Sequence, residues 1–164
     1  MGRKAAIVLL ALLAAAWVSA EMMTRTSRGG PTAMADVAIR TPDGTVRVGD
    51  LRGKVVLVDY WATWCPPCRA SIPGIEALYQ RYRDRGFAVV GVSMDDSPNV
   101  VPPFIQEMGM TYPAGLPVDR EKANAPPSLP TMVLLNRDGE EIWRQEGFAE
   151  SVEQELRRQV EQAL

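Results

Sequence analysis

The chain has 164 residues, of which 46% are hydrophobic, and this length is sufficient for one domain with a substantial core. The formal net charge is −2, and acidic and basic residues are interspersed, so no nucleic-acid partner is expected. The chain holds two cysteines and no histidine. One chain therefore cannot build a four-ligand zinc or iron–sulfur site, or use a histidine base, and we predict no metal. A metal shared between two chains stays open.

The N-terminus carries an apolar segment, Ala5 to Val18, which follows Arg3 and Lys4 and precedes small residues. This pattern is typical of a cleaved signal peptide. At about 14 residues the segment is shorter than the ~20 that cross a membrane, but an uncleaved anchor over residues 5–20 is the alternative. Both interpretations place the rest of the chain outside the cytoplasm, in the periplasm or its equivalent. We assign 1–20 to a signal peptide or anchor, 21–35 to a linker and 36–164 to one folded domain.

The domain is predicted to begin with a β-hairpin over residues 37–48. The following elements are, in chain order, a buried strand over 54–60, a helix up to 85, a buried strand over 87–93, a helix within 97–108, a short strand at 111–114, a strand over 131–136, a returning strand over 140–145 and a helix over 151–164. Strand, helix and strand in succession form a βαβ unit with a parallel pair. The sequence therefore predicts an α/β fold in which helices flank a central mixed sheet.

The chemistry is predicted to lie in Cys65 and Cys68, which stand where the first buried strand leads into a helix. A disulfide between them closes so short a loop that it stabilises the fold little. We therefore interpret the pair as a dithiol that cycles. Cys65 precedes the helix, where free backbone N–H groups and the helix dipole lower a thiol pKa from its usual ~8.5. Cys65 is thus expected to attack the substrate disulfide, and Cys68 to resolve the mixed disulfide.

The residues around the two cysteines are candidates for substrate contact. Pro66 and Pro67 lack an N–H group, so they offer no donor to sulfur, and they stiffen the loop. Trp64 and Trp61 flank the pair, where one or both cover the sulfurs or contact the substrate. Ordinary packing is the alternative for Trp61.

The segment VDYWATWCPPCR, residues 58–69, resembles the active-site segment of thioredoxin-like proteins, and within them the TlpA/ResA group of thiol–disulfide oxidoreductases. The resemblance extends over residues 36–164. Pro73 falls five residues after Cys68, where thioredoxins keep a helix kink, and the hairpin over 37–48 is similar to the extra N-terminal hairpin of the TlpA/ResA group.

The resemblance implies further site residues. Leu129 and Pro130 resemble the cis-proline segment of the family, which implies that Pro130 packs beside the disulfide and that the backbone of Leu129 pairs with the substrate chain. The family pattern is not complete, however. Many TlpA/ResA relatives carry a glutamate three residues after the second cysteine, and this chain has Ser71 there.

Asp59 lies late in the first buried strand, six residues before Cys65, where a carboxyl group is costly unless it is used or paired. The corresponding residue of thioredoxins is a buried acid that assists deprotonation of the resolving cysteine. Burial raises a carboxyl pKa, which suits a proton acceptor near neutral pH. The alternative is a partly solvated aspartate at a strand end.

Together these features predict an exported protein-disulfide oxidoreductase with no cofactor beyond the Cys65–Cys68 disulfide. The resemblance implies a reductant of protein disulfides, in maturation of cytochrome c or another metalloprotein, with electrons from a membrane thiol–disulfide donor. The alternatives are a net disulfide oxidant and a non-catalytic binding module with a thioredoxin fold. A peroxidase is disfavoured because the chain has no separate peroxidatic cysteine.

Overall fold

The fold was analysed in a computed structural model, which describes residues 32–164. The signal peptide or anchor predicted for residues 1–20 lies outside the described residues, as does most of the predicted linker. Across residues 32–164, the structure contains no helix with the length and apolar character needed to cross a membrane.

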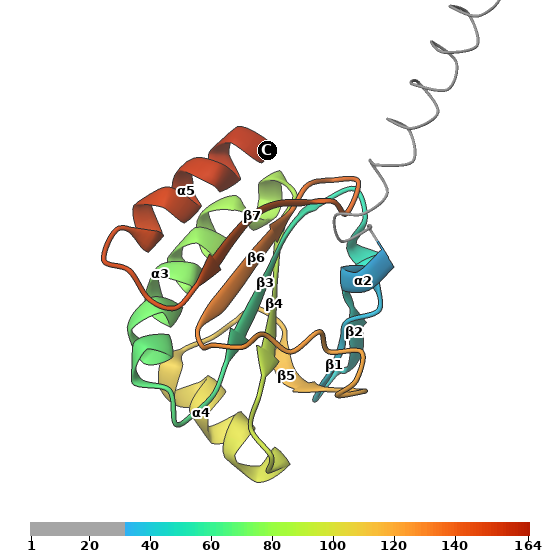
Figure 1. The fold of residues 1–164 in the computed structure, drawn as a ribbon, viewed down its shortest axis with the longest axis vertical. Coiled ribbons are helices and arrows are strands. Elements are labelled where there is room, and N and C mark those ends of the chain that lie inside the picture. The colour runs from blue at the N-terminus through green and yellow to red at the C-terminus, as the bar shows by residue number, and fades with distance from the viewer. Residues whose placement is uncertain (1–31) are drawn as a thin grey trace, which may run out of the picture. The chain divides into compact units, whose positions relative to one another are not determined.

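Seven strands form one mixed sheet in the order β2-β1-β5-β4-β3-β6-β7 (Figure 1). The strands are β1 (Ala38–Thr41), β2 (Gly44–Arg47), β3 (Val55–Trp61), β4 (Phe87–Ser93), β5 (Ala114–Pro117), β6 (Thr131–Leu135) and β7 (Glu141–Glu146). β3 runs parallel to β4 and antiparallel to β6, and all seven of its side chains are buried. This confirms the predicted βαβ unit and the N-terminal hairpin, which β1 and β2 form.

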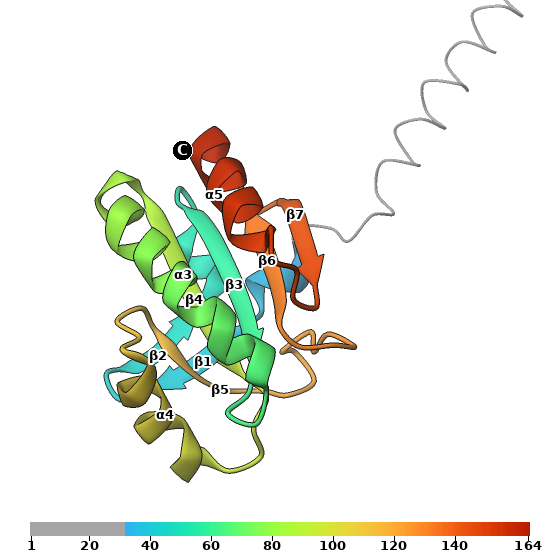
Figure 2. The ribbon, with the colours of Figure 1, turned by 90° about the vertical axis from the view of Figure 1, so that its left-hand side faces the viewer.

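The helices are α2 (Thr32–Ala35), α3 (Pro66–Tyr82), α4 (Val101–Met108) and α5 (Val152–Ala163), with short 3-10 helices η1 (Val48–Leu51), η2 (Arg83–Arg85) and η3 (Pro98–Val100). α3 connects β3 to β4 and lies beside α5 on one face of the sheet, whereas α2 lies on the other side (Figures 1 and 2). The helical segment stops at Gly86, whose φ of 92° is readily adopted only by glycine.

Side chains of β3 alternate between two cores, as a strand buried on both faces requires. Leu57 and Trp61 belong to the core beneath α3, α4 and α5, whereas Val58 and Tyr60 belong to the core that α2 and η1 close. Asp59 lies between these positions and, by the same alternation, points into the layer beneath α3. The carboxyl group is thus directed toward the side of the sheet that carries both cysteines.

The structure corrects one predicted element and adds a second. The short strand predicted at 111–114 instead forms as β5 over Ala114–Pro117, because the N–H of Thr111 donates to the Glu76 carboxylate at 2.9 Å and not to a strand. Residues 32–35, which fall in the range predicted as linker, form α2, and Met34 is buried in the second core. Packed structure therefore begins slightly before residue 36.

Candidate active site

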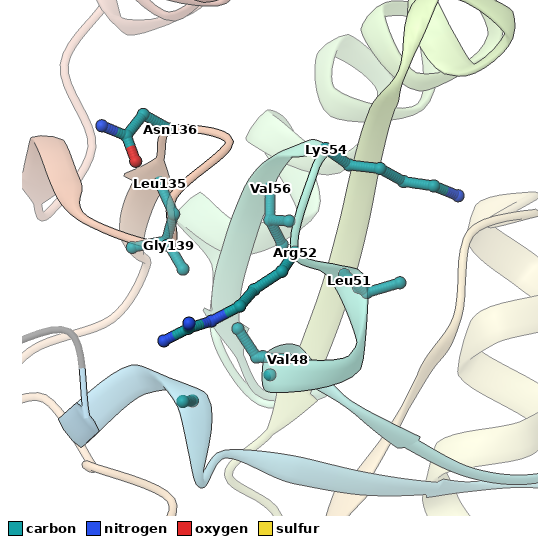
Figure 3. A pocket seen from close by; sticks show the side chains of 10 residues that line it. Val48, Leu51, Arg52, Lys54, Val56, Leu135, Asn136 and Gly139 are labelled. Carbon is teal, nitrogen blue, oxygen red and sulfur yellow. The ribbon is translucent and has the colours of Figure 1, made fainter.

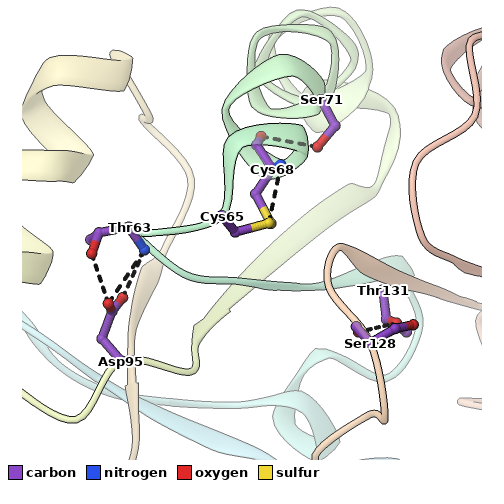
Figure 4. The surroundings of a disulfide bond; sticks show 7 residues. All are labelled: Thr63, Cys65, Cys68, Ser71, Asp95, Ser128 and Thr131. Carbon is purple, nitrogen blue, oxygen red and sulfur yellow. Dashed lines mark hydrogen bonds between the residues drawn. A yellow bond between two sulfur atoms is a disulfide. The ribbon is translucent and has the colours of Figure 1, made fainter.

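Cys65 and Cys68 form a disulfide where β3 leads into α3 (Figure 4). Cys65 caps the N-terminus of α3, and its Sγ accepts a hydrogen bond from the Cys68 N–H at 3.3 Å. Pro66 and Pro67 occupy the first turn of the helix. Backbone N–H groups in this turn have no acceptor within the helix, so the prolines cost no hydrogen bond. After reduction, the same N–H and the positive end of the helix would stabilise a thiolate at Cys65.

The two sulfurs differ in what they face. Both cysteines are nearly buried, with 4% of Cys65 and none of Cys68 exposed. Cys65 nevertheless lines a surface groove, and Cys68 does not. Of the two cysteines, Cys65 is therefore the one that an incoming disulfide can approach from the groove, and the order of attack stays a prediction.

The groove beside Cys65 has a volume of about 480 Å³. None of its lining side chains is charged; they are Trp64, Cys65, Pro66, Pro67, Met94, Pro126, Pro127, Ser128 and Leu129. Trp64 is 67% exposed, whereas Trp61 is fully buried and stacks on Phe104 at 4.9 Å between ring centroids. Packing is thus the correct interpretation of Trp61, and Trp64 alone of the two is available to a substrate.

The structure brings four of the five predicted substrate-contact residues to this groove: Trp64, Pro66, Pro67 and Leu129. Pro130 is buried and does not line it. The Leu129–Pro130 peptide bond is cis, as the resemblance implies. Just after it, the Thr131 hydroxyl donates to the Ser128 carbonyl at 2.8 Å and anchors this side of the groove to β6 (Figure 4).

Asp59 is fully buried, and neither of its carboxylate oxygens has a hydrogen-bond partner. The alternative of a partly solvated aspartate is therefore wrong. Burial raises the pKa of Asp59 from 3.8 to about 7, because the charged form is deprived of water without a compensating partner. A group that can gain or lose a proton near neutral pH thus lies in the layer that contains Cys68.

Sequence analysis missed Asp95, which holds the loop before Cys65. Asp95 is buried, and its carboxylate accepts hydrogen bonds from the Thr63 N–H at 3.0 Å and the Thr63 hydroxyl at 2.7 Å (Figure 4). The carboxylate also accepts a hydrogen bond from the Ser93 hydroxyl at 2.8 Å. A carboxylate two residues after a buried parallel strand, at the edge where binding sites gather, was the available signal. Asp95 fixes the path of the chain into the CPPC segment.

Ser71, which stands where many relatives carry an acid, is also buried, and its hydroxyl donates to the Cys68 carbonyl at 3.0 Å. The Ser71 hydroxyl is therefore used in a hydrogen bond within the first turn of α3. A second, small cavity of about 10 Å³ lies near the start of β3, beside Val56, at the end opposite Cys65 (Figure 3). No cysteine or carboxylate lines it, so it offers no rival site.

The cis-proline loop, the central strand and the cysteine pair at a helix start define a thioredoxin-like protein with a CxxC disulfide. Residues 32–126 match the AhpC/TSA family over more than half of the chain. The chain belongs to this AhpC/TSA family of thioredoxin-like proteins.

Individual relatives agree with this assignment. The thiol-disulfide oxidoreductase ResA of Oceanobacillus iheyensis is 39% identical over 80 residues, which are 49% of this chain and 42% of that protein. ResA of Bacillus subtilis is 31% identical over 99 residues, or 59% of this chain and 55% of that protein. The chain thus spans about half the length of the curated relatives it matches. A crystal structure of a candidate DsbE thiol:disulfide interchange protein from Chlorobium tepidum superposes with a TM-score of 0.70 at 28% identity, covering 79% of this chain and 94% of that chain.

The raised pKa of Asp59 predicts a pH-dependent stability. Because the folded pKa is about 7 and the ordinary value is 3.8, this group's stabilising contribution is complete below about pH 4 and is lost as the pH rises through 7. Asp59→Asn, which is neutral throughout, should gain up to about 4 kcal/mol over the wild type by about pH 8 and little at about pH 4. Urea unfolding of the oxidised protein across this range measures the difference. A difference in unfolding free energy between Asp59→Asn and the wild type that does not change with pH would contradict this prediction. The same pH trend in Asp84→Asn, at an exposed site, would contradict it as well.

The Asp95 network predicts that the loop before Cys65 depends on one carboxylate. Asp95→Ala leaves the two Thr63 donors without their acceptor, so we expect a loss of roughly 2–4 kcal/mol in the free energy of unfolding. Amide hydrogen exchange at Cys65 and Cys68 should accelerate as well. The matched control is Asp96→Ala, since the Asp96 side chain is 99% exposed and its ion pair with Arg120 lies at the surface. Equal effects of the two substitutions would show that Asp95 has no such role.

Proposed function

We propose that this protein is an extracytoplasmic thiol–disulfide oxidoreductase that reduces disulfides of protein substrates. The observation that carries the proposal is the arrangement of the Cys65–Cys68 pair: one sulfur caps α3 and lines a groove, and the other faces the core. The similarity to ResA proteins and to the DsbE-like structure supports the same activity.

The proposed reaction begins with the reduced pair. The Cys65 thiolate attacks one sulfur of the substrate disulfide, which forms a mixed disulfide and releases the other substrate sulfur as a thiolate. Cys68 then loses its proton to the Asp59 carboxylate, and the Cys68 thiolate attacks the Cys65 sulfur. The substrate leaves as a dithiol, and the protein retains the Cys65–Cys68 disulfide, so two electrons have passed to the substrate.

The groove suggests which substrate segments fit. Its lining is uncharged and includes four prolines, and exposed Trp64 stands at its edge. An extended segment with apolar residues beside its cysteine would therefore bury apolar surface without leaving a charge unpaired, and could stack on Trp64. Leu129 lines the groove, where its backbone can pair with the substrate chain.

The reducing direction, the export and the partners rest on the resemblance to the TlpA/ResA group and on the N-terminal segment of the sequence. In this proposal the cysteines of a maturing cytochrome c or another metalloprotein are the substrate. A membrane thiol–disulfide donor restores the dithiol, because the surrounding compartment is oxidising and supplies no electrons of its own.

The catalytic roles predict distinct variants. Cys65→Ser should abolish insulin disulfide reduction, because no nucleophile remains at the groove, whereas Cys68→Ala should accumulate a covalent mixed disulfide at Cys65 that dithiothreitol releases. Gel analysis under non-reducing conditions detects the adduct. Wild-type activity no higher than that of Cys65→Ser would refute catalysis and favour the binding-module alternative.

The direction of electron flow predicts the reduction potential of the cysteine pair. A reductant should equilibrate with glutathione or dithiothreitol at a potential near about −270 mV, whereas a net oxidant should lie near about −120 mV. Titration of the wild type against defined redox buffers, with the fraction of oxidised protein read by alkylation, gives the value. A potential near about −120 mV would show that the protein is a net oxidant and not a reductant.

A further inference from the structure

The side chain of Tyr60 reaches from the central strand β3 to the loop between β5 and β6. Its hydroxyl donates a hydrogen bond to the carbonyl of Ala123 at 2.8 Å, although the two residues are 63 positions apart in the chain. Both residues are buried, and Ala123 is the one buried residue between positions 118 and 129. The Tyr60 hydroxyl therefore holds the middle of a loop that otherwise lies at the surface.

The same residue also fixes the far end of this loop. Tyr60 is paired with Thr131, the first residue of β6, in the antiparallel register of β3 and β6. Residues 124–130, which we call the proline segment, thus run between two points that are both attached to Tyr60. One point is attached through the hydroxyl and the other through the strand pairing. The proline segment contributes four residues to the groove beside Cys65: Pro126, Pro127, Ser128 and Leu129.

Other parts of the groove are attached to neighbouring residues at the same end of β3. The N–H of Met94 donates to the Trp61 carbonyl at 2.8 Å, and the N–H of Cys65 donates to the Ala62 carbonyl at 3.2 Å. These two bonds and the strand pairing are made by the backbone. Of these contacts, only the bond to Ala123 is supplied by a side chain, so it is the one that the residue at position 60 decides.

One further contact holds the start of the proline segment. Nδ2 of Asn124 donates to the sulfur of Met34 in α2 at 3.2 Å. A thioether is a weak acceptor, whereas a phenol and a backbone carbonyl form an ordinary hydrogen bond. Burial raises the pKa of the Tyr60 hydroxyl, so this group stays protonated and remains a donor. The bond from Tyr60 is therefore the stronger of these two restraints.

We propose that Tyr60 is a positioning residue for protein substrates, because its hydroxyl holds the proline segment in place opposite a chain that reacts at Cys65. The inference rests on the proposed function, which makes this groove the site of the substrate chain. Without the hydroxyl, the proline segment is held at Thr131 and by the weaker Asn124 contact, so Leu129 is less well placed to pair with the substrate. A small disulfide needs only Cys65 and is indifferent to this change.

A role in stability alone makes a different prediction. Phenylalanine at position 60 fills nearly the same space but leaves the buried Ala123 carbonyl without its donor, which costs stability whatever the groove does. Once the protein is folded, such a loss affects all disulfide substrates equally. A positioning role acts through the proline segment, and therefore only on substrates that touch it.

The first test measures the mobility of the proline segment by ¹⁵N relaxation in the oxidised full-length protein. The amides of Ser128 and Leu129 should have order parameters near about 0.85 in the wild type and below about 0.6 in Tyr60→Phe, while the amide of Val90 in β4 stays rigid in both. Order parameters of Ser128 and Leu129 that are equal in the two proteins would overturn the proposal. Values below about 0.6 in the wild type would overturn it without any variant.

The second test compares two substrates of the reduced protein. In Tyr60→Phe, the KM for insulin should rise about tenfold at an unchanged kcat, whereas the rate with hydroxyethyl disulfide should stay that of the wild type. The matched control is Tyr79→Phe, which removes a hydroxyl on the opposite face of the sheet and should change neither.

An unchanged KM for insulin in Tyr60→Phe, or an equal loss with both substrates, would overturn the positioning role. A wild type that reduces neither substrate would defeat the proposed function instead. In that case the order parameters of Ser128 and Leu129 would still decide whether Tyr60 holds the proline segment.

Discussion

A carboxyl group held in the dry centre of the sheet, without a hydrogen-bond partner, is the constraint on which the rest of the site depends. β3 is buried along its whole length, and Asp59 is tolerated there because burial raises the carboxyl pKa to about 7, so that the group can be neutral below that pH. The same burial that makes this residue costly to the fold makes it responsive to a proton. If water reached Asp59 freely, the cost of burying the carboxyl group and the rise in its pKa would both disappear.

The site therefore has a solvent-facing side and a buried side, and the disulfide lies between them. Cys65 lines the uncharged groove at the start of α3, whereas Cys68 turns toward the core that also receives Asp59. The helix start acts on the first sulfur through its N–H groups, and the buried layer acts on the second through desolvation. Asp95 keeps this geometry in place, because it ties the loop before Cys65 to the end of β4.

Local signals account for the parts that were predicted correctly. The β-branched run of β3, the glycine that ends the α3 segment and the alternating hairpin strands each reflect interactions between residues close in the chain. The strand assigned to 111–114 was misplaced because the Thr111 N–H bonds to Glu76, 35 residues earlier in the chain.

The sequence by itself determined the cysteine pair, its place at a strand-to-helix junction and the buried acid six residues before it, because these depend on spacing within a single segment. Only the tertiary structure decided that Pro126 to Leu129 and Met94 complete the groove, and that Asp95 holds Thr63. These contacts join strands and loops that are distant in the chain. They follow from strand order and register, which no local periodicity of side chains encodes.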